Sequence, residues 1–169
     1  MNELIAKIEQ WANDRNIIKG SKPIDQAMKL FSEFGELADN VGKGRDCRDD
    51  IGDCLTVLII MSKQHGLSII RSIESSAMPM KDDIKDIVID FMRDLNNFTR
   101  SGNQFTLNLC INSLIKICLN TNCILTECLE IAYNDIKDRK GVMSNGVFIK
   151  ESDPAYESVI KAIEVNCGE

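Results

Sequence analysis

Four acidic residues stand in two pairs whose spacing could hold a divalent metal ion. Glu33 and Glu36 are three residues apart in FSEFGELAD, and Asp50 and Asp53 are three residues apart in DDIGD. Side chains with this spacing are neighbours on a helix surface, so each pair could offer two carboxylates to one ion. Four carboxylates without a histidine form an all-oxygen ligand set, which suits Mg²⁺ or Mn²⁺ rather than zinc or copper.

Each acid also has an ordinary explanation. Glu33 and Glu36 lie toward the polar side of their helix, where acids are usually only solvated, and Asp50 opens a helix, where it stabilises the dipole. Asp53 is harder to explain in this way, because it lies one turn into a helix that is apolar nearly all round. A buried, ionised carboxylate needs a partner or a metal ion, or else it becomes neutral. Asp53 is therefore the strongest single indication of a site.

The elements that must position these acids are helices, because apolar residues recur with helical spacing along the chain. We expect 141–154 to be extended, without an Asn-Gly hairpin, and Thr126 to be a helix N-cap. The pattern predicts an all-α fold and a single domain over 1–169. The expected helices are 2–15, 23–41, 49–64, 67–76, 82–98, 105–119, 127–140 and 154–165.

The second half of the chain faintly repeats the first. Two helices at 24–41 and 50–64 are followed by two more at 82–98 and 105–119, and CLTVLII is similar to CINSLIK. One explanation is that all buried helix pairs look alike. The other is a degenerate internal duplication, in which Arg93 falls where Glu33 would be.

Composition excludes several classes of protein. Hydrophobic residues make up 44% and charged residues 27%, which argues against disorder, and the net charge of −6 argues against nucleic-acid and membrane partners. We see no signal peptide and no run of roughly 20 apolar residues, so we expect a cytoplasmic protein. The seven cysteines include no C-x-x-C and His65 is the only histidine, so we expect reduced, core-filling cysteines rather than a zinc site.

Basic residues gather late in the chain, in NDIKDRK. Asn134 precedes Lys137, Arg139 and Lys140 by one to two turns, and Lys150 follows in the extended segment. Positive charge at a helix C-terminus is favourable by roughly 0.3–1 kcal/mol, and this alone would explain the cluster. Phosphate binding is the alternative.

Two motifs together resemble the MazG-like, all-α nucleoside triphosphate pyrophosphohydrolases. KLFSEFGELAD followed by DDIGDCLTVLIIM is similar to the family's E-x-x-E and [E/D]-x-x-D pair, and AYNDIKDRKGVMSNGVFIK is similar to its second motif. Helical, dimeric dUTPases have an Asn and a basic residue three apart before a glycine, which correspond to Asn134, Lys137 and Gly141 here. The resemblance covers about residues 8–66 and 123–153.

Two departures accompany this resemblance. Shorter family members pass almost directly from the acidic helices to the late motif, whereas here an inserted helix pair occupies about 67–122. The inserted helices could replace those of a partner subunit. In addition, Asp50 stands where many members have Glu.

The resemblance implies a helical bundle of the pyrophosphohydrolase type that hydrolyses a (d)NTP to (d)NMP and pyrophosphate with Mg²⁺, or Mn²⁺. It implies metal ligands at Glu33, Glu36, Asp50 and Asp53, with Glu36 also activating the attacking water. It further implies substrate contacts at Asn134, Lys137, Arg139 and Lys150, and a homo-oligomer that is a dimer or a tetramer. Such enzymes clean or shape nucleotide pools in bacteria and phages. The alternative function is a non-catalytic helical module that binds a nucleotide or a protein, and the preferred base stays open.

Overall fold

The computed structural model describes residues 1–76 and 83–167, with the side chains of 165–167 left aside. The described chain is mostly helical, as the hydrophobic spacing predicts, and residue 82 of one expected helix lies outside it. The helices are α1 (Asn2–Asp14), α2 (Ile17–Gly20), α3 (Pro23–Gly42), α4 (Arg48–Gln64), α5 (Ile69–Glu74), α6 (Ile84–Ser101), α7 (Gln104–Asn120), α8 (Leu125–Ile136) and α9 (Tyr156–Cys167).

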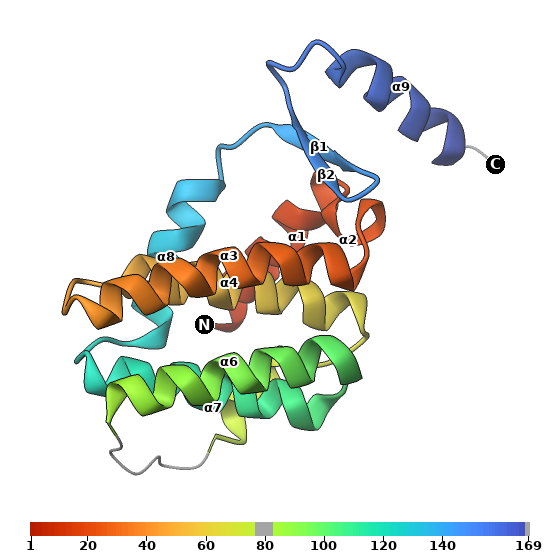
Figure 1. The fold of residues 1–169 in the computed structure, drawn as a ribbon. Helices are drawn as coiled ribbons and strands as arrows, with labels where there is room; N and C mark the ends of the chain where they lie inside the picture. Colours follow the sequence, from red (N-terminus) through yellow and green to blue (C-terminus); the bar gives the residue numbers. More distant parts are fainter. Residues whose placement is uncertain (77–82, 168–169) are drawn as a thin grey trace.

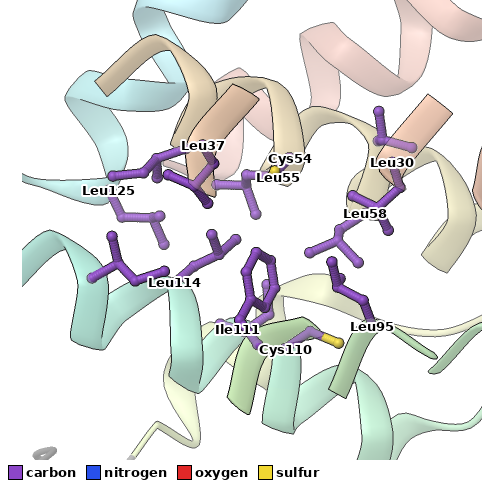
Figure 2. Packing of buried hydrophobic residues seen from close by; sticks show 14 of the residues in the cluster. Leu30, Leu37, Cys54, Leu55, Leu58, Leu95, Cys110, Ile111, Leu114 and Leu125 are labelled. Carbon is purple, nitrogen blue, oxygen red and sulfur yellow. The ribbon is translucent and has the colours of Figure 1, made fainter. Parts of the chain in front are cut away.

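Two helix pairs stacked on one another form the centre of the molecule. α3 lies along α4, α6 lies along α7, and the second pair packs beneath the first, with α3 on α6 and α4 on α7 (Figure 1). Leucines of the two pairs meet between them, including Leu55 and Leu58 of α4 and Leu114 of α7 (Figure 2). The helices α6 and α7 therefore complete the core beneath α3 and α4, the two helices that carry the predicted carboxylates. The proposed duplication stays a prediction.

α4 is buried almost all round, because α1, α3, α7 and α8 all pack against it. From Asp50 to Ser62 every residue is buried except Asp53, which is half-buried. Gly52 permits the closest of these approaches, since a Cβ there would lie 2.1 Å from the Cys128 carbonyl oxygen in α8. The sequence prediction that Asp53 lies in a buried helix that is apolar nearly all round is thus confirmed.

A β-hairpin follows α8, and the expectation of no Asn-Gly hairpin was wrong. Strands β1 (Gly141–Ser144) and β2 (Val147–Lys150) pair antiparallel, with Ser144 opposite Val147. Asn145 and Gly146 form the turn with φ values of 49° and 80°. Positive φ at both central residues is the geometry that joins twisted strands and that Asn-Gly favours. The hairpin projects from one end of the bundle together with α9 (Figure 1).

The boundaries of α8 also differ from those predicted. Ile124, not Thr126, is the N-cap, and the helix ends at Ile136 rather than near Lys140. Arg15 explains the early end, because its guanidinium donates hydrogen bonds to the carbonyl oxygens of Lys137 (3.2 Å) and Arg139 (2.7 Å). These contacts with α1 hold the chain in a turn and direct it toward the hairpin.

Within the described residues, no single helix is long and apolar enough to cross a bilayer. α7 and α8 together have sufficient length and apolar composition, but they form a pair bent by 101°.

Candidate functional site

A cavity of about 660 Å³ opens between α3, α4, the end of α8 and the hairpin. Its apolar wall includes Trp11, Val57 and Phe148. The remaining wall is polar and strongly charged, unlike the core beside it. The polar residues that line it are Asp25, Gln26, Lys29, Glu33, Glu36, Asp49, Asp53, Thr56, Asp135, Arg139 and Lys150.

Three of the four predicted carboxylates line this cavity. Glu36 is exposed, Asp53 is half-buried, and Glu33 is only 4% exposed. The alternative explanation of Glu33 as an acid on a solvated face of its helix is therefore wrong. The i, i+4 neighbour Lys29 forms an ion pair with Glu33, which supplies one positive charge to a region with several negative ones.

Asp53 has the most perturbed electrostatics of these acids. Burial is the main cause that raises its pKa to about 7, the nearby charges of Glu33 and Asp49 act in the same direction, and Lys29 and Arg139 oppose them. Burial and Asp135 likewise raise the pKa of Asp49. Crowded carboxylates with raised pKa values are groups that a bound cation would stabilise in the charged form.

Asp50 lies apart from its predicted partners. It is 8% exposed, it does not line the cavity, and the Asn40 side-chain amide donates a 2.8 Å hydrogen bond to its carboxylate. Burial raises the pKa of Asp50 in spite of this bond, and Asp49, Glu36 and Glu33 contribute in the same direction. Its neighbour Asp49 faces the cavity instead. Asp50 was predicted as a metal ligand from the sequence, whereas Asp49 was not.

Asp94 is a buried acid in the same protein whose carboxylate has both a hydrogen-bond donor and a cationic partner. Asp94 in α6 is 3% exposed, the Ser113 hydroxyl donates to it at 3.1 Å, and the Arg93 guanidinium pairs with it at 3.1 Å. By contrast, no side chain in the described part of the chain donates a hydrogen bond to Asp53. The acidic pair α3–α4 thus carries charge that the fold itself leaves uncompensated.

The predicted substrate-binding residues separate into two groups. Arg139 and Lys150 line the cavity together with the acids of α3 and α4. Asn134 and Lys137 do not line it; they are exposed and bond to each other, with the Lys137 ammonium 2.8 Å from the Asn134 side-chain oxygen. Of the second motif, Asp135, Arg139 and Lys150 therefore lie in the same cavity as the acids of α3 and α4. Asp135 was not predicted from the sequence, although it lies in the last turn of α8 and lines the cavity.

Two polar side-chain atoms at the cavity are buried without a hydrogen-bond partner in the described structure. They are the Trp11 indole Nε1 and the Thr56 hydroxyl. A buried polar group without a hydrogen-bond partner lowers the stability of the fold by about 1–3 kcal/mol, so such groups usually bond to protein, water or a ligand. The Arg15 guanidinium lies over the Trp11 ring, with its Cζ 4.9 Å from the ring centroid.

The donor set suits a hard cation, but the oxygens have to draw together to bind one. Within the described residues, only three cysteines bring one ligand atom each within 4.8 Å of one another. The carboxylates of Glu33, Glu36, Asp49 and Asp53 share one cavity without reaching that spacing. Repulsion between like charges favours such separation, and a divalent ion would reverse it.

Comparison with known proteins gives one partial likeness. No family model matches this chain, and no solved structure matches it. The chain is similar to an uncharacterized 18.2 kDa protein from the rep-hol intergenic region of Haemophilus phage HP1 (strain HP1c1), with 46% identity over 67 residues. The matched stretch covers 38% of this chain and 41% of the phage protein. The chain is thus similar to less than half of a phage protein, and this likeness carries no activity.

Proposed function

We propose that the protein is a Mg²⁺-dependent nucleoside triphosphate pyrophosphohydrolase, which converts a (d)NTP to (d)NMP and pyrophosphate. The observation that carries the proposal is the raised pKa of Asp53 among several carboxylates, in a cavity that Arg139 and Lys150 also line. The motif resemblance supplies the reaction class. A cavity of about 660 Å³ is of the size that small-molecule ligands occupy.

The acids divide by exposure into two roles. Glu33 and Asp53, which line the cavity and are the more buried, would hold Mg²⁺. Asp50 would join them only after a rearrangement that releases it from Asn40. A bound Mg²⁺ would neutralise charge that develops on phosphate oxygens. Glu36 is the most exposed of the four and would orient and deprotonate the attacking water. Asp49 lines the same wall and is a further candidate ligand.

The two basic residues that line the cavity would bind the phosphate oxygens that the metal ion does not contact. Arg139 presents a guanidinium that can form paired hydrogen bonds to phosphate, and Lys150 adds a second positive charge. Trp11 and Thr56 offer unused hydrogen-bonding atoms for the sugar or the base. Asn134 and Lys137 would contact substrate only through a rearrangement of the turn after α8.

The experiment that tests the proposal measures pyrophosphate release from a panel of NTPs and dNTPs with Mg²⁺. We expect release by the wild type, and loss of release in EDTA and in the isosteric variant Asp53→Asn. Asp90→Asn is the matched control, because Asp90 is an exposed acid paired with Arg93 on α6, away from the cavity. Absence of release from every nucleotide by folded wild-type protein would refute the enzymatic proposal.

A non-catalytic nucleotide-binding protein is the second candidate, and the separation of the carboxylates favours it. Calorimetry with Mg²⁺ and a non-hydrolysable triphosphate distinguishes the two. Binding without pyrophosphate release would support the second candidate.

We also propose that the chain forms a homo-oligomer, a dimer or a tetramer. Ile24 and Met28 lie one turn apart on α3 and are 49% and 58% exposed. Exposed apolar side chains on one face favour association. Light scattering on the full chain should therefore give a mass above that of a monomer, and Met28→Glu should lower it.

A further inference from the structure

Three cysteines gather where α7 turns into α8. Cys118 lies in the last turns of α7, Cys123 in the connection, and Cys128 in α8. Their sulfur atoms all lie within 4.8 Å of one another, and those of Cys123 and Cys128 are 3.5 Å apart. Cys118 and Cys128 are buried, whereas Cys123 is partly exposed. The three are five residues apart in sequence, so a search for C-x-x-C does not detect them.

The turn between the helices holds this arrangement in place. Asn122 adopts a left-handed conformation with φ of 53°, and the Cys123 amide donates to the Cys118 carbonyl oxygen at 3.0 Å. The Thr121 hydroxyl lies 3.2 Å from the Cys123 sulfur. The backbone therefore returns Cys123 to the end of α7, where Cys128 meets it from α8.

The sulfur spacing fits coordination of one thiophilic ion. Zinc–sulfur bonds are about 2.3 Å long, so two sulfurs of a tetrahedral site lie about 3.8 Å apart. The sulfurs of Cys123 and Cys128 are 3.5 Å apart and no pair of the three is more than 4.8 Å apart, so small side-chain rotations would bring them to this spacing. Thiolate ligands select soft or borderline ions such as zinc over magnesium.

A second cavity gives this cluster access to solvent. Its volume is about 550 Å³, and Cys123 lies in its wall together with Cys47, Arg45 and Arg48. An ion could enter from this side and keep its fourth coordination position toward the cavity. Cys54 is different, because it is fully buried in the apolar core and lines neither cavity.

We propose that Cys118, Cys123 and Cys128 bind one zinc ion that ties α7 to α8. Each thiol would lose its proton to solvent on binding. The ion would fix the bend between the inserted helices and α8, which leads to Asp135 and Arg139 of the acidic cavity. This site differs from the proposed Mg²⁺ site in its ligands and its position, so neither depends on the other.

Cobalt titration of the full-length, metal-stripped protein under reducing conditions tests the proposal. We expect thiolate-to-cobalt charge-transfer absorption that saturates at one equivalent and disappears when zinc is added. The variant Cys123→Ser should lose this absorption, and zinc should raise the melting temperature of wild type but not of this variant. Cys54→Ser is the matched control and should keep both signals.

Three results would overturn the proposal. The first is the absence of charge-transfer absorption from protein that circular dichroism shows to be folded and reduced. The second is unchanged absorption in both Cys123→Ser and Cys118→Ser. The third is metal-free protein, purified without reductant, in which peptide mass spectrometry finds a disulfide between Cys123 and Cys128. Cys123 is partly exposed, so its serine variant is expected to fold.

Discussion

Replacement of Asp53 by asparagine should stabilise the metal-free protein at alkaline pH. Asp53 has a pKa of about 7 in the folded chain against 3.8 as its ordinary value, mainly because burial disfavours the carboxylate. Between these two pH values the folded state holds a proton that the unfolded state has released. The free energy of unfolding therefore falls as pH rises through this window, and stays low above pH 7. Asparagine keeps the shape and carries no charge.

The magnitude follows from the shift. One pKa unit corresponds to about 1.4 kcal/mol, so the full shift would give about 4 kcal/mol. Because Asp53 is only half-buried and solvent screens it, we expect the variant to gain about 1–2 kcal/mol at pH 8. We expect almost no gain near pH 4, where the wild-type side chain is protonated when folded.

Urea unfolding followed by circular dichroism, in EDTA at about pH 4 and pH 8, measures this difference. Saturating Mg²⁺ should then stabilise the wild type at pH 8, by about 2.7 kcal/mol at a concentration one hundred times the dissociation constant, and leave the variant unchanged. Asp90→Asn controls for the loss of one surface carboxylate. A gain that is equal at both pH values, or a loss at pH 8, would refute the electrostatic argument.

Three further predictions concern packing, substrate binding and the turn. Gly52→Ala should lower the free energy of unfolding by more than about 2 kcal/mol in urea titration, because its Cβ would lie 2.1 Å from a backbone oxygen of α8, whereas Gly35→Ala, with no atom near, should raise it by up to about 1 kcal/mol. Arg139→Ala should weaken nucleotide binding in calorimetry by about tenfold, while Lys137→Ala, outside the cavity, should change it less than twofold; equal effects would contradict the assignment. Gly146→Ala should lower the melting temperature, because it combines a φ of 80° with a Cβ position 2.7 Å from a carboxylate carbon; an unchanged value would contradict the turn geometry.

Local spacing predicted the parts of the site that lie within one helix. Asp53 was predicted as a perturbed carboxylate because the apolar residues around it define a buried helix, and the structure places it half-buried with a raised pKa. The spacing of Glu33 and Glu36 located α3 beside α4, but it did not show which of the two is buried. The burial of each glutamate depends on which helices pack against α3. Hydrophobic periodicity counts both glutamates as polar and so does not distinguish them.

Contacts between distant segments could not be predicted in the same way. Arg15 ends α8 from 122 and 124 residues away, and this contact turns Arg139 toward the cavity. Nothing in the spacing of NDIKDRK indicates it. The hairpin could have been found, because Asn145 and Gly146 are a strong turn signal, but four-residue strands are too short to show alternation.

The contrast between Asp94 and Asp53 links the fold to the proposed function. α6 and α7 neutralise a buried acid with Arg93 and Ser113, so this protein can satisfy such a group from within one helix pair. Among the described residues of α3 and α4, Lys29 is the one cation that forms an ion pair with an acid of the cavity, and several carboxylates line that cavity. Uncompensated charge lowers the stability of the free protein, and a bound cation would recover that stability. Metal-linked stabilisation that is lost with Asp53 and unaffected by Asp90 would therefore identify the acidic cavity as the site before any substrate is known.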